Sequence, residues 1–269
     1  MSHPERRHLK TTFNQDAELY DRARPRYPEQ LFDEFVALCG LQPGAVLLEI
    51  GCGTSHATVP MAKRGFHIVC VELGENLAAV ARKNLEAYPE VEVVTAPFED
   101  WDAGGERFDL VFGAQSWHWL DPEVRYQKAS DVLKSGGSLA IIDVEHAFPE
   151  AADPFFFEIQ DVYRAIGEDF PDEEWPPPLP EDVVDMRDEV VASGLFGEFQ
   201  SRRCVWDVMY TADAYVDLLN TFSNHIAMEP EKLDFLYQNV RERINARPDP
   251  HVRRHWLAIL NVARRVPSP

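Results

Sequence analysis

The sequence predicts an α/β fold, with a largely parallel sheet that is covered by helices on both faces. Between residues 45 and 144, short apolar runs alternate with segments whose apolar residues recur at helical spacing. Five strands that alternate with helices imply right-handed crossovers between parallel neighbours. A loop with two glycines follows the first apolar run, at the strand-to-helix turn. Hydrophobic residues make up 45% of the chain, which is enough for a sizeable core.

The expected elements follow from apolar runs and from helix start and stop signals. Pro28 at the first helical position and Gly40 after the last one delimit a helix over 29–39. Further helices are expected at 54–64, at 75–88, and from Pro122 to near Leu133. Pro60 lies inside the second of these, where it removes a hydrogen bond and predicts a kink or a late start. The expected strands are 45–50, 67–72, 91–95, 108–114 and 138–144.

The alternation breaks after Glu145. Residues 147–182 are rich in proline and aromatic residues, and they predict a cap over the ligand edge of the sheet with a short helix at 155–166. A strand at 199–210 and helices at 212–227 and 231–245 follow, whereas 255–264 fits a helix or a strand equally well. The domains expected are a ligand-binding core at 1–146 with an N-terminal lid (1–27), a cap insertion at 147–195, and C-terminal strands with inserted helices at 196–269.

Composition limits the classes of partner. A formal charge of −20 and a pI near 4.8 disfavour nucleic acid and anionic membranes. The four cysteines have no C-x-x-C spacing and indicate reduced thiols in a cytoplasmic protein. No stretch approaches the roughly 18 apolar residues of a spanning helix, and no His/Asp/Glu spacing suggests a metal site. We expect a cytoplasmic monomer or homodimer that acts on a small molecule.

The loop E-I-G-C-G-T-S at residues 49–55 is the strongest indication of a ligand site. Gly51 and Gly53 allow the backbone to approach a ligand closely. Glu49 places a carboxylate where a pyrophosphate would need bare N–H groups, so it favours a ligand with ammonium or sulfonium charge, as in S-adenosylmethionine. Glu72 ends the second strand, where a carboxylate accepts both hydroxyls of a ribose.

Several segments, in this order, together resemble the class I S-adenosylmethionine-dependent methyltransferases. Within that class the chain is similar to the small-molecule branch that includes trans-aconitate methyltransferase-like proteins (methyltransferase types 11 and 25). The resemblance covers residues 13–145 and, more weakly, 195–266. The segments that carry it are 13–28, 49–55, 71–72, 98–101, 108–111, 117–122 and 133–137.

The resemblance implies a Rossmann-like, doubly wound sheet of seven strands, mostly parallel, with a helical or irregular cap. Its last strand, 255–264, would run antiparallel and pair with 199–210. The sequence departs from the family at Ser55, where the pattern G-x-G-x-G usually has its third glycine. The Ser55 side chain could narrow the approach to the methionine part of the cofactor, or it could cap the following helix.

The resemblance also implies a set of site residues. Arg24 would pair with the methionine carboxylate of the cofactor, and His118 is the candidate catalytic base, with a purely structural role as the alternative. The cofactor-binding residues would be Tyr20, Arg24, Glu49, Gly51, Gly53, Ser55, Glu72, Leu73, Phe98, Ala114 and Gln115. The acceptor-binding residues would be Tyr27, Trp117, His118 and Trp119.

The expected activity is methyl transfer from S-adenosylmethionine to a small-molecule acceptor, which leaves S-adenosylhomocysteine. An oxygen acceptor, such as a carboxylate, follows from the family resemblance alone. One alternative is a nicotinamide-dependent oxidoreductase, although His56 stands where the dinucleotide pattern has its third glycine. The other alternative is a module that binds S-adenosylmethionine without turning it over.

Overall fold

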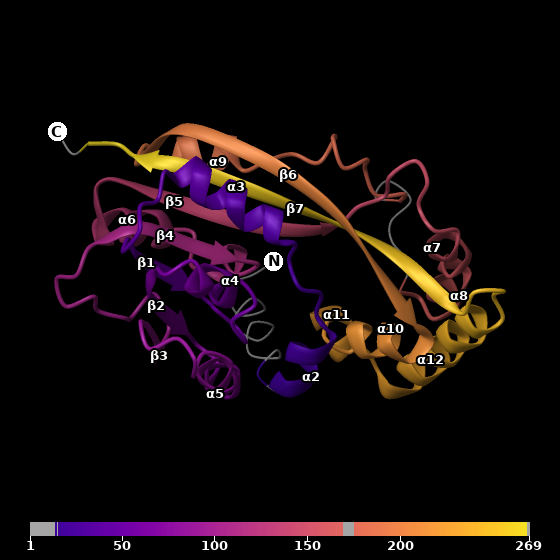
Figure 1. Ribbon diagram of the computed structural model, residues 1–269. Helices are drawn as coiled ribbons and strands as arrows, with labels where there is room; N and C mark the ends of the chain where they lie inside the picture. The colour runs from indigo at the N-terminus through magenta and orange to yellow at the C-terminus, as the bar shows by residue number, and fades with distance from the viewer. Residues whose placement is uncertain (1–13, 15, 169–174, 268–269) are drawn as a thin grey trace.

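The computed structural model describes residues 14, 16–168 and 175–267. Seven strands form one sheet in the order β3-β2-β1-β4-β5-β7-β6 (Figure 1). Strands β1 to β5 pair in parallel, and β7 is antiparallel to both of its neighbours. The expected α/β sheet, with its antiparallel pairing near the C-terminus, is therefore confirmed. The strands are β1 Val46–Ile50, β2 His67–Glu72, β3 Val91–Thr95, β4 Phe108–Ala114, β5 Leu133–His146, β6 Phe196–Thr211 and β7 His251–Arg265.

The helix expected over 29–39 is confirmed with the same ends, and most of the other expected helices are present with different ends. The helix expected over 54–64 begins late, at Thr58, so that Pro60 falls in the first turn, where its missing N–H removes no helical bond. The helix expected at 155–166 is two short helices, and the one expected at 212–227 is interrupted between Leu219 and Ser223. The helices before residue 150 are α2 Ala17–Ala23, α3 Glu29–Cys39, α4 Thr58–Lys63, α5 Glu75–Asn84, the 3-10 turn η1 Trp117–Trp119 and α6 Arg125–Val132.

The remaining helices are α7 Phe155–Glu158, α8 Gln160–Ala165, α9 Arg187–Ala192, α10 Ala212–Leu219, α11 Ser223–Ile226 and α12 Pro230–Asn245. The sequence analysis did not predict α2, η1 or α9. All three are short, and a helix of three to seven residues is too brief for its apolar spacing to stand out from a loop.

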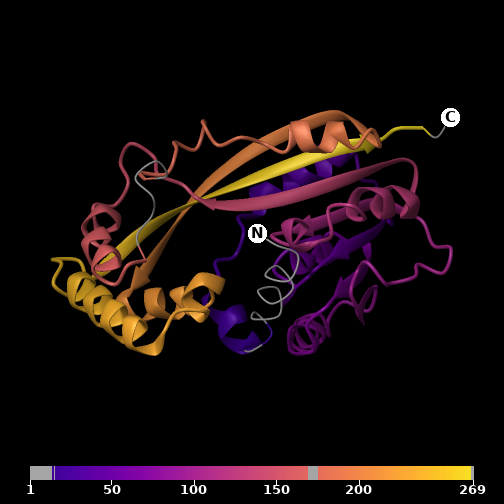
Figure 2. The same ribbon diagram turned by 180° about the vertical axis from the view of Figure 1, so that it is seen from behind.

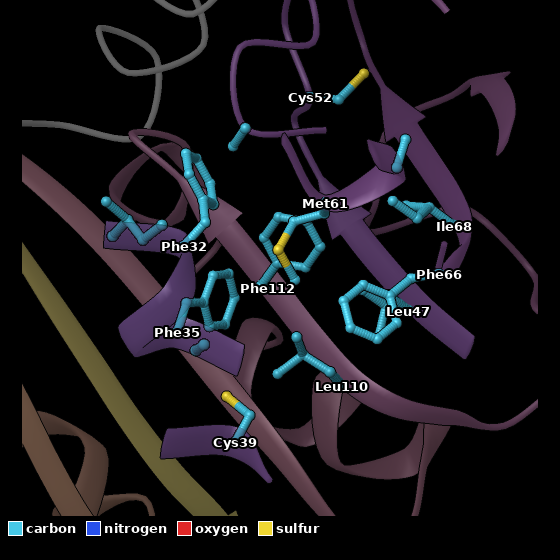
Figure 3. Close-up of a cluster of buried hydrophobic side chains, with 14 of the residues drawn as sticks. Phe32, Phe35, Cys39, Leu47, Cys52, Met61, Phe66, Ile68, Leu110 and Phe112 are labelled. Atoms are coloured by element: carbon cyan, nitrogen blue, oxygen red, sulfur yellow. The ribbon is translucent and has the colours of Figure 1, made fainter. Parts of the chain in front are cut away.

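The sheet has a hydrophobic core on each face. On one face α3 and α4 pack on the strands, and Phe35 of α3 meets Phe112 of β4 with ring centroids 5.4 Å apart (Figure 3). Met61 of α4 lies in the same cluster and is fully buried. On the other face, Trp117, Tyr126 and residues of α9 and β6 pack together. Burial on both faces keeps the edge formed by the strand ends in a fixed position.

Strands β6 and β7 extend well past the rest of the sheet. Strand β5 ends at His146, opposite Trp256 of β7, whereas β6 and β7 stay paired as far as Thr211 and His251. This two-stranded ribbon carries a group of helices, α7, α8, α10, α11 and α12, which we call the outer subdomain (Figures 1 and 2). A third apolar core joins ribbon and helices. The outer subdomain therefore stands in front of the carboxyl edge of the parallel strands.

Ser55 has a left-handed backbone, with φ of 77°. Only glycine adopts this conformation without a steric cost to its side chain, which for other residues is about 1–2 kcal/mol. The Ser55 hydroxyl donates to the carbonyl of Thr54, its own neighbour. Helix α4 has Ala57 as its N-cap and no side-chain capping bond, so the alternative that Ser55 caps the helix is wrong.

We expect Ser55→Gly to raise the free energy of unfolding by about 1 kcal/mol, because it relieves the left-handed strain and loses only a local hydrogen bond. Urea denaturation of the two proteins measures the difference. Ser135→Gly is the matched control, since Ser135 is exposed and has no positive φ; there the added backbone freedom should lower stability. A loss of stability in Ser55→Gly would contradict the assignment of strain.

Candidate active site

A cavity of about 420 Å³ opens at the carboxyl edge of the parallel strands. Gly51 and Gly53 of the glycine loop, Glu72 at the end of β2 and Ala114 at the end of β4 line its inner side. Residues of β7 and the loop between α10 and α11 line its outer side, including Arg254. Strands β1 and β4 are neighbours in the sheet. The connection after β1 leads to β2 on one side, whereas the connection after β4 leads to β5 on the other side, so the strand order reverses between β1 and β4. Ligands of open α/β sheets bind at such switch points.

The glycine loop is packed tightly against the end of β4. Gly51 has φ of 67°, and a Cβ there would lie 2.6 Å from the Cβ of Ser116. A Cβ on Gly113 would meet the Ser116 hydroxyl at 2.6 Å, and this hydroxyl donates to the carbonyl of Ile50. Position 51 therefore requires glycine for two reasons, its backbone conformation and the close approach of Ser116.

The Glu72 carboxylate is held in place by backbone N–H groups. Its two oxygens accept hydrogen bonds from Gly53 N at 2.8 Å and from Gly74 N at 2.7 Å. The residue is 5% exposed, and burial raises the pKa of its carboxyl, while these hydrogen bonds oppose the rise. Glu72 and the neighbouring Leu73 both line the cavity. The carboxylate is thus oriented toward the ligand space before any ligand binds.

Glu49 does not line the cavity, in contrast to the expectation from sequence. Its side chain is 1% exposed under the loop, where the Cys70 thiol donates to it at 3.9 Å. Burial raises the pKa of the Glu49 carboxyl to about 8. At neutral pH the group is therefore mostly protonated. The sequence analysis expected a charged carboxylate at the loop, because the position of Glu49 near the end of an apolar run does not reveal whether its side chain reaches the ligand space or stays buried beneath the loop.

Helix α2 connects the two sides of the cavity. The Asp21 carboxylate lies 3.1 Å from Nε2 of His56, which follows the glycine loop, and accepts from Asn84 at 3.2 Å. Burial raises the pKa of Asp21, but the bond with His56 and other bonds outweigh it and hold the pKa below its usual value. Three residues later, Arg24 Nη2 donates to the carbonyl of Thr221 in the outer subdomain at 2.7 Å.

The structure brings together most of the residues that the sequence analysis singled out. Trp117 and Ser55 do not line the cavity. Trp117 is fully buried in the core below it, with its ring 5.2 Å from that of Tyr126, and Ser55 is 1% exposed. His118 is exposed toward the cavity and its ring lies 4.7 Å from that of Trp119. The expected residues that do line the cavity are Tyr20, Arg24, Tyr27, Gly51, Gly53, Glu72, Leu73, Phe98, Ala114, Gln115, His118 and Trp119.

Sequence reasoning missed the outer wall of the cavity. Trp206 and Trp256 stack across β6 and β7 with centroids 6.3 Å apart, and Arg254 lies on the same face of β7, two residues from Trp256. Glu145 and His146, at the end of β5, also line the cavity. The alternation of side chains along 251–265 would have placed Arg254 beside Trp256, but periodicity alone did not identify this segment as a strand.

The described ranges of the chain are residues 14, 16–168 and 175–267. No group of three or more His, Cys, Asp or Glu residues in them is arranged to hold a metal ion. No helix in them combines the length and apolar character needed to cross a membrane.

Comparisons with known proteins agree with this geometry. Residues 48–141 match the family described as methyltransferase domain. An uncharacterized methyltransferase of Mycobacterium tuberculosis is 24% identical over 90% of this chain and 89% of its own length.

Solved structures show the same fold. A candidate type II methyltransferase of Anaeromyxobacter dehalogenans is 22% identical, with a TM-score of 0.61 over 91% of this chain and 99% of that one. Phosphoethanolamine N-methyltransferase 2 of Haemonchus contortus is 14% identical, with a TM-score of 0.50 over 88% of this chain and 52% of that one. Residues 48–141 are therefore similar to a methyltransferase domain, and the chain has the Rossmann-like fold of these solved methyltransferase structures.

Proposed function

We propose that the protein transfers a methyl group from S-adenosylmethionine to a small-molecule acceptor, with an oxygen atom, such as that of a carboxylate, as the acceptor. One observation carries this proposal: a single cavity joins the glycine loop and the Glu72 carboxylate to His118 and Trp119. A cofactor and a small acceptor can therefore meet in one enclosed space. The oxygen acceptor rests on family resemblance alone.

The inner half of the cavity fits the cofactor. The preoriented Glu72 carboxylate suits the two ribose hydroxyls. Each of its oxygens accepts one backbone N–H and has a further lone pair, which can accept a hydrogen bond from a ribose hydroxyl. Leu73 and Phe98 would pack on the adenine, and the glycine loop leaves the backbone open to the methionine part. The Haemonchus enzyme, which shares the fold, was solved with S-adenosylhomocysteine. The bound cofactor supplies a methyl group on a positively charged sulfur.

The chain itself contributes alignment and exclusion of water. Holding two reactants in line can contribute roughly 7–11 kcal/mol, and the outer subdomain and α2 close the cavity on the sides away from the sheet. Glu72, Glu99 and Glu145 line the same cavity, which makes its inner part favourable for a positive charge. His118 is the candidate base for an acceptor hydroxyl, whereas a carboxylate acceptor needs none.

The alternatives have less support. The match of residues 48–141 to a methyltransferase domain does not favour a nicotinamide-dependent oxidoreductase. Glu72 also accepts the N–H of Gly53, within the loop that would have to cradle a pyrophosphate. A module that binds the cofactor without turnover would not need the enclosed outer half of the cavity, with its polar side chains. Isothermal titration with S-adenosylmethionine and with NAD decides between the first two classes, because binding of NAD alone would overturn our proposal.

We expect Glu72→Gln to weaken S-adenosylhomocysteine binding at least tenfold. The amide nitrogen of the glutamine would face a backbone N–H group, either that of Gly53 or that of Gly74, and would lose the hydrogen bond there. Each lost hydrogen bond to a charged group is worth about 1.5–3 kcal/mol. Isothermal titration measures the affinity, and Glu75→Gln, in the exposed first turn of α5, is the control. Equal affinity of Glu72→Gln and the control would contradict the ribose assignment.

If His118 is the base, His118→Gln should lower kcat by about 10²–10⁴ and abolish the acidic limb of the pH–kcat profile, because the glutamine amide does not take up a proton. The affinity for S-adenosylhomocysteine should stay unchanged. His67→Gln is the control, since His67 is exposed at the start of β2. A variant that keeps the wild-type pH profile would assign His118 a structural role.

We also propose that Glu49 supports the loop in its neutral form. The pKa of Glu49 in the folded protein, about 8, lies above the ordinary value of 4.5, so its contribution to stability is complete below pH 4.5 and is lost as pH rises through 8. Glu49→Gln should therefore gain stability relative to wild type between pH 5 and 9, at up to about 1.4 kcal/mol per pH unit. Thermal denaturation across this range tests it. Glu92→Gln, on the exposed side of β3, should give a constant difference.

A further inference from the structure

Two guanidinium groups of the cavity share one aromatic ring, that of Phe222. Arg254 lies at the outer end, whereas Arg24 also contacts the ring of Tyr20, beside Gly53 of the glycine loop. Arg24 lies with its Cζ 4.4 Å from the ring centroid of Phe222, and Arg254 lies with its Cζ 5.1 Å from the same centroid. All three residues line the cavity. Among the described residues, no carboxylate lies within 4 Å of either guanidinium. The two groups thus bring positive charge to one place without a carboxylate partner in the part of the chain that the structure describes.

Both guanidiniums are poorly supplied with hydrogen-bond acceptors. Arg254 is 7% exposed; its Nη1 donates to the Tyr215 hydroxyl at 3.2 Å, and its Nε has no partner within the described part of the chain. The Nε of Arg24 is likewise buried without a partner there, although its Nη2 bonds Thr221. Burial lowers the pKa of Arg24, and the charge of Arg254 lowers it further. A buried charge without a partner is unfavourable, and an anion bound to a guanidinium group would remove this cost.

The acidic residues of the cavity do not fill this gap. Glu72 is bonded to the glycine loop on the inner side. Burial raises the pKa of the Glu145 carboxyl, and among the described residues Glu145 forms no ion pair with either arginine. His146 adds no charge of its own, because burial and the charges of Arg254 and His255 hold its pKa well below the usual value. Arg254 therefore holds a positive charge at the outer end of the cavity without an ion-pair partner among the described residues.

We propose that Arg254 binds an oxyanion group, a carboxylate or a phosphate, that anchors the methyl acceptor at the outer end of the cavity. Arg24, which also contacts Tyr20 beside the glycine loop, keeps its expected role toward the methionine carboxylate of the cofactor. The guanidinium fork of Arg254 matches the oxygens of a carboxylate and of a phosphate. This inference rests on the proposed function and deepens it, since it makes the acceptor an anionic small molecule. The anchor lies beyond Trp256, farther from the glycine loop than the end of β5, so the rest of the acceptor can extend toward His118.

A binding experiment tests the oxyanion site without turnover. The thermal midpoint of the S-adenosylhomocysteine-saturated protein is measured in malonate, in inorganic phosphate and in chloride at equal ionic strength. We expect malonate or phosphate to raise it in wild type, and the rise to be at least halved in Arg254→Met. The larger of the two responses identifies the preferred anion. Arg253→Met is the matched control, because Arg253 is the adjacent residue of β7 and is exposed; its response should equal that of wild type.

A transfer experiment then tests the acceptor. A metabolite extract is separated on an anion-exchange resin, and each fraction is incubated with the protein and methyl-labelled S-adenosylmethionine. Label should enter compounds of the retained fraction, and prior treatment with phosphatase shows whether the anchor is a phosphate. With the acceptor found, Arg254→Met should raise its KM at least tenfold and leave the KM of S-adenosylmethionine unchanged.

The outcomes separate this inference from the proposed function. Labelling confined to the unretained fraction, or equal anion responses in wild type and Arg254→Met, would overturn the anion site. Failure to bind S-adenosylhomocysteine would overturn the proposed function. In that case the thermal midpoints of wild type and Arg254→Met, measured in malonate and in phosphate without S-adenosylhomocysteine, would still show whether Arg254 binds an anion. A low thermal midpoint in chloride would show that Arg254→Met is misfolded. Arg254→Lys, which keeps the positive charge but loses the guanidinium fork, would then replace it. Its thermal midpoint should rise less with malonate or phosphate than that of wild type.

Discussion

The close approach of the glycine loop to the end of β4 is the constraint on which the site depends. Ser116 bonds the carbonyl of Ile50, and its side chain occupies the space that a Cβ on Gly51 would need. This contact joins β1 and β4 where the strand order reverses, so it sets both the width of the cavity floor and the direction in which the chain leaves each strand. Glu72 is then fixed by the same loop through the N–H of Gly53. A shift of the loop would displace the floor and the carboxylate together.

Much of the parallel part of the sheet could be predicted because local and global signals agree there. Strands 67–72, 91–95 and 108–114 coincide with the observed β2, β3 and β4, since buried parallel strands are continuous apolar runs bounded by turn residues. Strand β5 starts earlier than expected, at Leu133, because Leu133 pairs with Phe108 before an irregularity over residues 134–137, after which pairing resumes between Ser138 and Leu110. Turn residues therefore marked a bend within the strand and not its beginning.

The site was predictable where one short segment holds the information, as in the glycine loop and at Glu72. It was not predictable where function depends on segments far apart in sequence. Arg254 becomes notable only when the fold sets it beside Phe222 and Arg24, with no carboxylate in reach among the described residues. Trp117 illustrates the opposite case: the aromatic motif at 117–119 is local, but only the structure shows which of its rings turns into the core.

Helix α2 has a consequence for the width of the cavity. Asp21 and Arg24 lie one turn apart on this helix, and they hold the loop after the glycines and the outer subdomain respectively. The same short helix therefore ties both sides of the cavity to each other. A displacement of α2 that breaks either hydrogen bond would loosen the link between the loop after the glycines and the outer subdomain, so the width of the cavity depends on where this helix lies.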